Sequence, residues 1–586
     1  MLIALGLSSA LGGAAFAQQL DLQGRNLFVI TLDSYSGVTN SGARSANLTI
    51  GVRSSSYRFD GTIADGVSTV GIIKSGLGTM TLNGDNPYSN GTSVAAGALV
   101  AGVAGALGSG YVALSDGVSL GFAAPMTIAN PILISSGADA TLDTRAFDVT
   151  LSGEIVGAGA LTKVGSGTLT VNVTRPDAGV NASGGVNAYS GGTYLNAGAL
   201  VVGNAGALGS GAVTMADGVR LAFAGPMTFT NSIALSGRLR ASLDTGAADV
   251  ALTGVISGAG ALTKIGDGTL TLAGANTYKG GTYLDAGTLA IANAQALGLG
   301  ALYMAENTTL TFAGAASLAN DIIFARSGDP TIDTGSGDIT ISGVISGPGA
   351  LTKIGSGTLT LAGANTYEGG THLDAGTLAV ANAQALGSGA LFMAENTTLS
   401  FAGAASLAND IIFARSGDPT IDTGSGAITI SGVICGPGAL TKIGSGTLTL
   451  TGLNAYTGGT YLNAGALVAG NASALGSGGV TLADGVRLAF AGPMTFANSI
   501  ALAGPAGASL DTGAADIALS GLVSGPGALT KIGSGTLTLT GLNAYTGGTY
   551  LNAGALVAGN AAALGSGGVT LADGVRLAFA GPMTFA

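Results

Sequence analysis

Residues 527–556 read GALTKIGSGTLTLTGLNAYTGGTYLNAGAL, and close variants of this segment recur along the chain. The lysine of each copy marks the register, and it stands at Lys74, Lys163, Lys264, Lys353, Lys442 and Lys531. Successive lysines are 89 residues apart, except for one interval of 101 residues that contains a 12-residue insertion between Val173 and Val186. The chain is therefore a tandem array of six copies with a period of 89 residues.

Each copy alternates short strands with glycine corners. Residues 536–540, Thr-Leu-Thr-Leu-Thr, place leucine on one face and threonine on the other, as in a half-buried strand. The Gly-Ser-Gly, Gly-Gly and Asp-Gly segments between strands supply the positive φ angles that tight corners need. The pattern predicts an all-β solenoid in which one repeat forms roughly four coils. With stacked strands about 4.8 Å apart, the mature chain would extend over roughly 120 Å.

The composition argues against several classes of protein. Of 586 residues, 104 are Gly, 9% are charged, and there is one His and one Cys. Collagen needs glycine at every third position, and coiled coils need abundant charged residues. Disordered chains have low hydrophobicity, whereas 47% of these residues are hydrophobic. The net charge of −11 argues against nucleic acid as a partner, because nucleic-acid-binding proteins carry basic patches.

The N-terminal sequence predicts an export signal. Residues 1–17, MLIALGLSSALGGAAFA, are apolar and end in the A-x-A cleavage pattern, although the usual positive n-region is missing. We therefore expect a signal peptide at 1–17, an N-terminal cap with the first coils at 18–70, and the repeats at 71–586, the last one truncated. No stretch of 18 apolar residues follows position 17, so no transmembrane helix is expected.

The repeated segment resembles the autotransporter-associated β-strand repeat, whose pattern is roughly G-x-L-T-K-x-G-x-G-T-L-x-L-x-G-x-N-x-Y-x-G-G-T. The match is nearly complete around the last four lysines, looser at Lys74 and interrupted at Lys163. The resemblance implies a right-handed parallel β-helix, displayed at the surface of a Gram-negative bacterium as the passenger of a type V secretion system. It also implies an outer-membrane β-barrel translocator as a partner, on the same chain or on a separate one. Because the chain stops at Ala586 in the same phase as Ala497, we expect a truncated sequence, with a free secreted repeat protein as the alternative.

Several residues are candidates for catalysis. The aspartic-protease tripeptide Asp-Thr-Gly begins at Asp244, Asp333, Asp422 and Asp511, with Asp143-Thr144-Arg145 as a relative. Those enzymes need two such carboxylates that share a proton, whereas copies one period apart would be separated by roughly 19 Å. His372 replaces the tyrosine or serine of other copies, and Cys435 replaces Ser or Val near a turn. We interpret all of these as structural, and we predict no catalytic residue.

Three further features recur in every copy. Acidic residues precede Gly or Asn at Asp116, Asp217, Glu306, Glu395, Asp484 and Asp573; they indicate turns, and we predict no metal or cofactor site. The recurrent lysine is expected to run its stem along the surface with its ammonium in water. Asparagines stand at Asn86, Asn187, Asn276, Asn365, Asn454 and Asn543, each followed two residues later by a tyrosine. We expect that tyrosine to pack over a corner with its hydroxyl in water, and an exposed row of these pairs could contact carbohydrate or protein.

These observations predict a non-enzymatic stalk that serves in adhesion or cell–cell contact, with repeats that assist export and folding. One alternative is a carbohydrate-active enzyme, such as a polysaccharide lyase, on the same scaffold. It would need an ionisable cluster that breaks the repeat, and the one long break holds only Arg175 and Asp177. Another alternative is a self-associating fibre or biofilm component, since exposed strand edges favour self-association.

Overall fold

The computed structural model describes residues 18–173 and 187–584. The predicted signal peptide, residues 1–17, and most of the predicted insertion, residues 174–186, lie outside the described part, so both stay predictions. The chain divides into two compact units, residues 1–301 and 302–586, and each is described here by itself.

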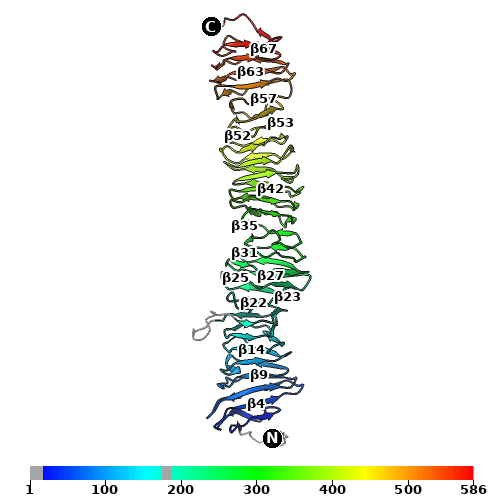
Figure 1. The fold of residues 1–586 in the computed structure, drawn as a ribbon, viewed down its shortest axis with the longest axis vertical. Coiled ribbons are helices and arrows are strands. Elements are labelled where there is room, and N and C mark those ends of the chain that lie inside the picture. Colours follow the sequence, from blue (N-terminus) through cyan, green and yellow to red (C-terminus); the bar gives the residue numbers. More distant parts are fainter. Residues whose placement is uncertain (1–17, 174–186, 585–586) are drawn as a thin grey trace. The chain divides into compact units, whose positions relative to one another are not determined.

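Unit one is built of short parallel strands. Its ten-stranded sheet contains, in spatial order, β5 (Tyr57–Phe59), β8 (Thr79–Leu82), β10 (Ala98–Ala101), β12 (Ser119–Phe122), β15 (Asp139–Asp143), β18 (Ala160–Val164), β21 (Thr193–Leu195), β23 (Val213–Met215), β26 (Ile233–Leu235) and β29 (Ile256–Gly258). Neighbours in this sheet are two or three strands apart in sequence and pair in parallel. The chain therefore goes once round the solenoid between one strand and the next (Figure 1).

Unit two repeats this architecture. Its twelve-stranded sheet contains β36 (Ala316–Leu318), β39 (Ile339–Ile341), β42 (Thr358–Leu361), β44 (Thr377–Val380), β46 (Thr398–Phe401), β49 (Thr420–Asp422), β52 (Leu440–Ile443), β54 (Thr460–Leu462), β56 (Val480–Leu482), β59 (Ile500–Leu502), β62 (Val523–Gly525) and β65 (Ala544–Tyr545). Its pairs are parallel as well. The predicted all-β parallel helix is thus confirmed.

Helical structure is almost absent. The described residues contain one short 3-10 helix, η1 (Ala104–Leu107). Among these residues, no helix has the length and apolar character that crossing a bilayer would require. The density of glycine explains this result, because glycine is unfavourable in helix interiors and serves corners instead.

The strand register shows how many turns one repeat occupies. On the outward face of unit two, residues of successive turns pair in the order Thr352, His372, Phe392, Ile412 and Cys435. Four turns thus take 83 residues, which confirms the prediction of about four coils per 89-residue repeat. The next equivalent threonine, Thr441, lies six residues further round the coil. The lysine-bearing strands β41 (Leu351–Ile354), β52 and β63 (Leu529–Ile532) accordingly belong to three different sheets.

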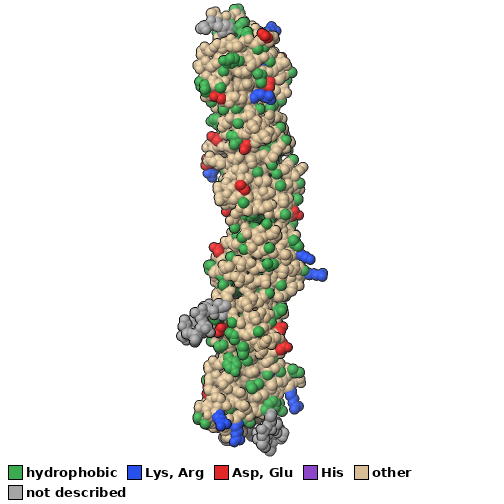
Figure 2. Space-filling view, in the orientation of Figure 1, with side chains coloured by type: hydrophobic (Ala, Val, Ile, Leu, Met, Phe, Trp, Pro, Cys, Tyr) green, Lys and Arg blue, Asp and Glu red, His purple; other side chains and the backbone are tan. Residues whose placement is uncertain are grey.

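The inward faces of the strands build the core of each unit. In the twelve-stranded sheet, fully buried side chains pair from turn to turn in the order Leu359, Leu378, Leu399 and Ile421. Each such side chain contributes about 1.5–3 kcal/mol to stability. Leu537 and Leu539 are fully buried too, as their alternation with threonine predicted. The outward faces carry few charged side chains, as Figure 2 shows for one face of each unit.

Candidate functional site

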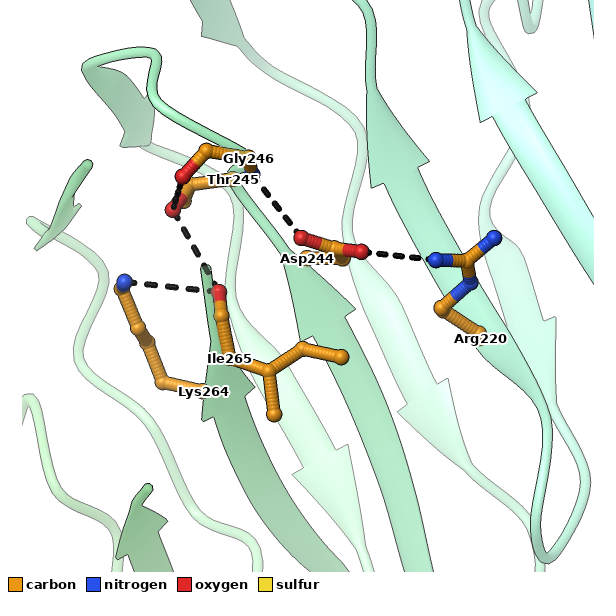
Figure 3. Close-up of polar contacts among 6 residues, drawn as sticks. All are labelled: Arg220, Asp244, Thr245, Gly246, Lys264 and Ile265. Carbon is orange, nitrogen blue, oxygen red and sulfur yellow. Dashed lines mark hydrogen bonds and ion pairs between the residues drawn. The ribbon is translucent and has the colours of Figure 1, made fainter. Parts of the chain in front are cut away.

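The Asp-Thr-Gly tripeptides form turns. Asp244 ends β27 (Arg240–Asp244), and its Oδ1 accepts a hydrogen bond of 2.8 Å from the Gly246 amide (Figure 3). Its Oδ2 accepts a hydrogen bond of 2.8 Å from Arg220. In unit two the aspartates at 333, 422 and 511 make the same turn bond to the glycine two residues on, and they lie in three different sheets. The structure therefore does not bring two of these carboxylates together, and the interpretation as a turn is confirmed.

The recurrent lysine is fully buried in all six copies. The ammonium of Lys353 donates hydrogen bonds to the carbonyl oxygens of Ile354 (2.9 Å) and Gly355 (2.7 Å) at its own corner. It also donates to the carbonyl of Ala375 in the next turn at 3.0 Å. The other five copies make the same three bonds, and Lys163 reaches Ala197 across the insertion. The prediction that this ammonium lies in water was wrong.

The glycine corner explains why the lysine turns inward. Gly355 has a φ of +82°, and at this tight corner the carbonyls of Gly355 and Ala375 accept from the lysine, whereas that of Ile354 also accepts from the Thr334 amide. Buried carbonyls need donors, and an ammonium offers three. Burial disfavours the charged form, and it lowers the pKa of Lys163, Lys264, Lys353 and Lys442 to about 8. Within residues 18–173 and 187–584, none of the six lysines forms an ion pair. Backbone carbonyls accept most of their hydrogen bonds, and Lys353 also donates to the Thr334 hydroxyl at 3.0 Å. The charge of nearby Asp333 raises the pKa of Lys353 and so opposes part of the effect of burial.

The recurrent asparagine links three successive turns. Oδ1 of Asn365 accepts a hydrogen bond of 2.8 Å from the Ile345 amide, 20 residues earlier. Nδ2 donates a bond of 2.6 Å to the carbonyl of Ala385, 20 residues later. The other asparagines of the set make both bonds to the equivalent residues. Because the side chain is buried, each copy gains a polar bridge that water does not weaken.

The recurrent tyrosine is also fully buried, so the prediction of a wet hydroxyl was wrong. The hydroxyl of Tyr367 lies 2.6 Å from Oγ1 of Thr371, four residues on, and its ring meets Phe324 edge-on with centroids 5.8 Å apart. Burial raises the pKa of all six tyrosines, that of Tyr545 to about 12. The expected exposed row of Asn and Tyr therefore does not exist, and these residues offer no surface to carbohydrate or protein.

The other candidate residues lie apart. His372 stacks on Phe392 with ring centroids 4.5 Å apart, and Cys435 lies three turns further along the same outward row. Asp116, Asp217 and Asp484 accept backbone amides at turns, as their sequence context predicted. Of the residues that the structure describes, no three His, Cys, Asp or Glu side chains gather in a group that could hold a metal ion.

We use the name polar corner for the buried Lys, Asn, Tyr and Thr of one repeat, although they lie at two successive corners of the coil, the lysine at the first and the other three at the second. Lys353, Asn365, Tyr367 and Thr371 form it in the fourth copy, for example. The threonine was not predicted, although the spacing Tyr-x-x-x-Thr holds in all six copies and indicates it. Chemically, this arrangement binds turns to one another; it presents no group to a substrate.

Comparison with known proteins identifies the repeated segment. A family model described as the passenger-associated-transport-repeat matches residues 72–101, 161–202, 262–291, 351–380, 440–469 and 529–558. A curated relative, the adhesin BmaC autotransporter of Brucella suis biovar 1 (strain 1330), is 30% identical over 442 residues. That alignment covers 65% of this chain and 12% of the relative, so the chain spans a small part of the relative's length. No solved structure matches the chain. Each of the six matches contains a polar-corner lysine, and the chain thus contains six passenger-associated-transport repeats.

Proposed function

We propose that the chain is an exported passenger, displayed at the surface of a Gram-negative bacterium, that works as a non-enzymatic adhesive scaffold. The similarity to an autotransporter adhesin supports display and adhesion. The six transport repeats support export through an outer-membrane β-barrel translocator, on the same chain or on a separate one. Repeated outward surfaces permit weak multivalent contact with a second cell or a host matrix.

The polar corner carries the proposed link to export. Its bonds between turns join residues that are mostly 20 to 23 positions apart, so each new turn can dock on the one before without distant parts of the chain. Contacts of this local kind allow folding to propagate turn by turn. A chain that emerges unfolded from a narrow barrel would fold outside it one turn after another, and each folded turn would keep the chain from sliding back into the barrel.

Display of the chain on the surface of a bacterium tests its role in adhesion. The chain is fused to a heterologous autotransporter barrel on a non-adherent bacterium, with the barrel alone as the control. We expect at least a tenfold increase in attachment to epithelial cells or to immobilised polysaccharide. Equal attachment of the two strains, at equal surface display, would contradict the adhesive role.

Export is tested by protease protection during secretion. We expect protection to advance from one end of the chain in steps, because the contacts are local. Protection that appears along the whole chain at once would contradict the proposed coupling of export to folding.

The enzymatic alternative is tested on the purified chain, since release of unsaturated sugars from a polyuronide would favour a lyase.

A further inference from the structure

One buried hydroxyl in unit one lacks a hydrogen-bond partner. Oγ1 of Thr263, whose residue is 5% exposed, is the single such side-chain atom among the described residues. Thr263 belongs to β30 (Ala261–Ile265), where it pairs with Ser242 of β27 on one side and with Tyr283 of β32 (Thr282–Leu284) on the other. A buried polar group without a partner costs about 1–3 kcal/mol, so this hydroxyl calls for an explanation.

An arginine covers this threonine. Arg240 begins β27, and its guanidinium carbon lies 3.3 Å from the ring centroid of Tyr283, so the side chain reaches across the strand of Thr263. A guanidinium donates hydrogen bonds and accepts none, so Arg240 can take no bond from the hydroxyl. Arg240 is exposed and forms no ion pair within the described part of the chain.

The preceding copy shows what the site lacks. The equivalent residues are Asp139, Thr162 and Tyr194, which share the register of the arginine, threonine and tyrosine. There the threonine hydroxyl donates a hydrogen bond of 2.7 Å to Oδ1 of Asp139. The same backbone thus holds a carboxylate over the threonine in one copy and a guanidinium in the next. A carboxylate from outside would satisfy both the unpaired hydroxyl and the unpaired guanidinium.

We propose that Arg240 and Thr263 bind the carboxylate of an acidic sugar residue in a polysaccharide. One carboxylate oxygen accepts from the Thr263 hydroxyl, as Asp139 does in the preceding copy, and the guanidinium binds the other oxygen. A rotation of the exposed arginine side chain away from the tyrosine ring opens the site. The proposal deepens the proposed adhesive function, on which its biological role rests, by assigning a ligand class and a site.

The surroundings favour a sugar over a peptide. The outward row next to the site carries the hydroxyl of Ser242, which suits the hydroxyl groups of a sugar ring. Leu239 is 69% exposed beside Arg240 and offers an apolar surface to the C–H face of a sugar. The nearby carboxylates are committed: Asp217 accepts the amide of Leu239 at 2.8 Å, and Asp244 pairs with Arg220 (Figure 3). Neither carboxylate forms an ion pair with Arg240.

Binding is measured by calorimetry with the purified chain and an oligogalacturonate of defined length. The fully methyl-esterified, neutral oligosaccharide and a polyglutamate peptide are the comparison ligands. We expect the acidic sugar to bind at least tenfold more tightly than the neutral one. Equal binding of the two sugars would overturn the proposal, and tighter binding of the peptide would overturn its assignment to a sugar.

Three variants test the residues. Arg240→Gln is expected to weaken binding at least tenfold, since a hydrogen bond to a charged group contributes about that much. Thr263→Val is expected to weaken binding severalfold while it raises the melting temperature, because it removes the unpaired hydroxyl; unchanged affinity would mean a structural role only. Arg240→Asp installs the arrangement of Asp139 and is expected to abolish binding. Thr162→Val, at the already satisfied site, is the matched control and should leave affinity unchanged.

The sugar-binding experiment and the adhesion experiment can fail independently of each other. If the displayed chain adheres and the purified chain fails to bind the acidic sugar, this site is refuted and the adhesive role stands. If the purified chain binds but the displayed chain does not adhere, the site stands and the adhesive role fails.

Discussion

Replacement of one buried lysine tests the polar corner most directly. Lys353→Met keeps the apolar stem and removes the three donors that satisfy the carbonyls of Ile354, Gly355 and Ala375. The carbonyls of Gly355 and Ala375 are left without a donor, at a cost of about 2 kcal/mol each, whereas the Ile354 carbonyl keeps the Thr334 amide at 3.2 Å. Removal of the charge returns part of this cost, because the pKa of about 8 against an ordinary 10.5 corresponds to about 3 kcal/mol of desolvation. The net loss of local stability is therefore about 1 kcal/mol.

Amide hydrogen exchange measures this loss where it occurs. A local destabilisation of about 1 kcal/mol speeds exchange roughly fivefold, since each 1.4 kcal/mol is a factor of ten. Peptides that cover residues 351–380 should show the effect. The equivalent residues 440–469, around the intact Lys442, serve as the control within the same molecule. Unchanged exchange at 351–380 would refute the view that the ammonium holds two turns together.

Three further predictions concern the other members of the corner and its charge. Asn365→Ala removes bonds to two neighbouring turns, and we expect about 2–4 kcal/mol of lost local stability, seen as new proteolytic cleavage near the corner. Tyr367→Phe keeps the ring and loses one hydroxyl contact with Thr371, so urea denaturation should report only about 1 kcal/mol. The buried lysines have pKa values below their unfolded value of 10.5, so the unfolded chain binds more protons between about pH 8 and 10.5, and in that range their contribution to stability rises with pH. The buried tyrosines have raised pKa values, so their contribution to folding stability is complete below pH 10 and is lost above it. The urea concentration at the unfolding midpoint, followed by circular dichroism, should therefore rise from pH 7 to about 9.5 and then fall. A steady decline from pH 7 would contradict this.

Much of the architecture can be predicted because its signals are local. Alternation of Leu with Thr in residues 536–540 defines an inward and an outward face, and glycine marks each corner. The six lysines define the period, and the structure confirms about four turns in each. The Asp-Thr-Gly turns were predicted correctly for the same reason, since their bond spans two residues.

The polar corner and the Arg240 site could not be predicted in this way, because their partners come from other turns. Whether Lys353 faces water or the core depends on carbonyls at its own corner and on Ala375, 22 residues later. The unpaired Thr263 depends on residues one turn before and one turn after it. The sequence alone therefore determined strands, corners and period, which are properties of neighbours along the chain. Only the tertiary structure decided which polar groups are buried and which hydrogen-bond partners they have. Stacking of the turns brings together residues about 20 positions apart, and a buried donor is stable only where it meets an acceptor.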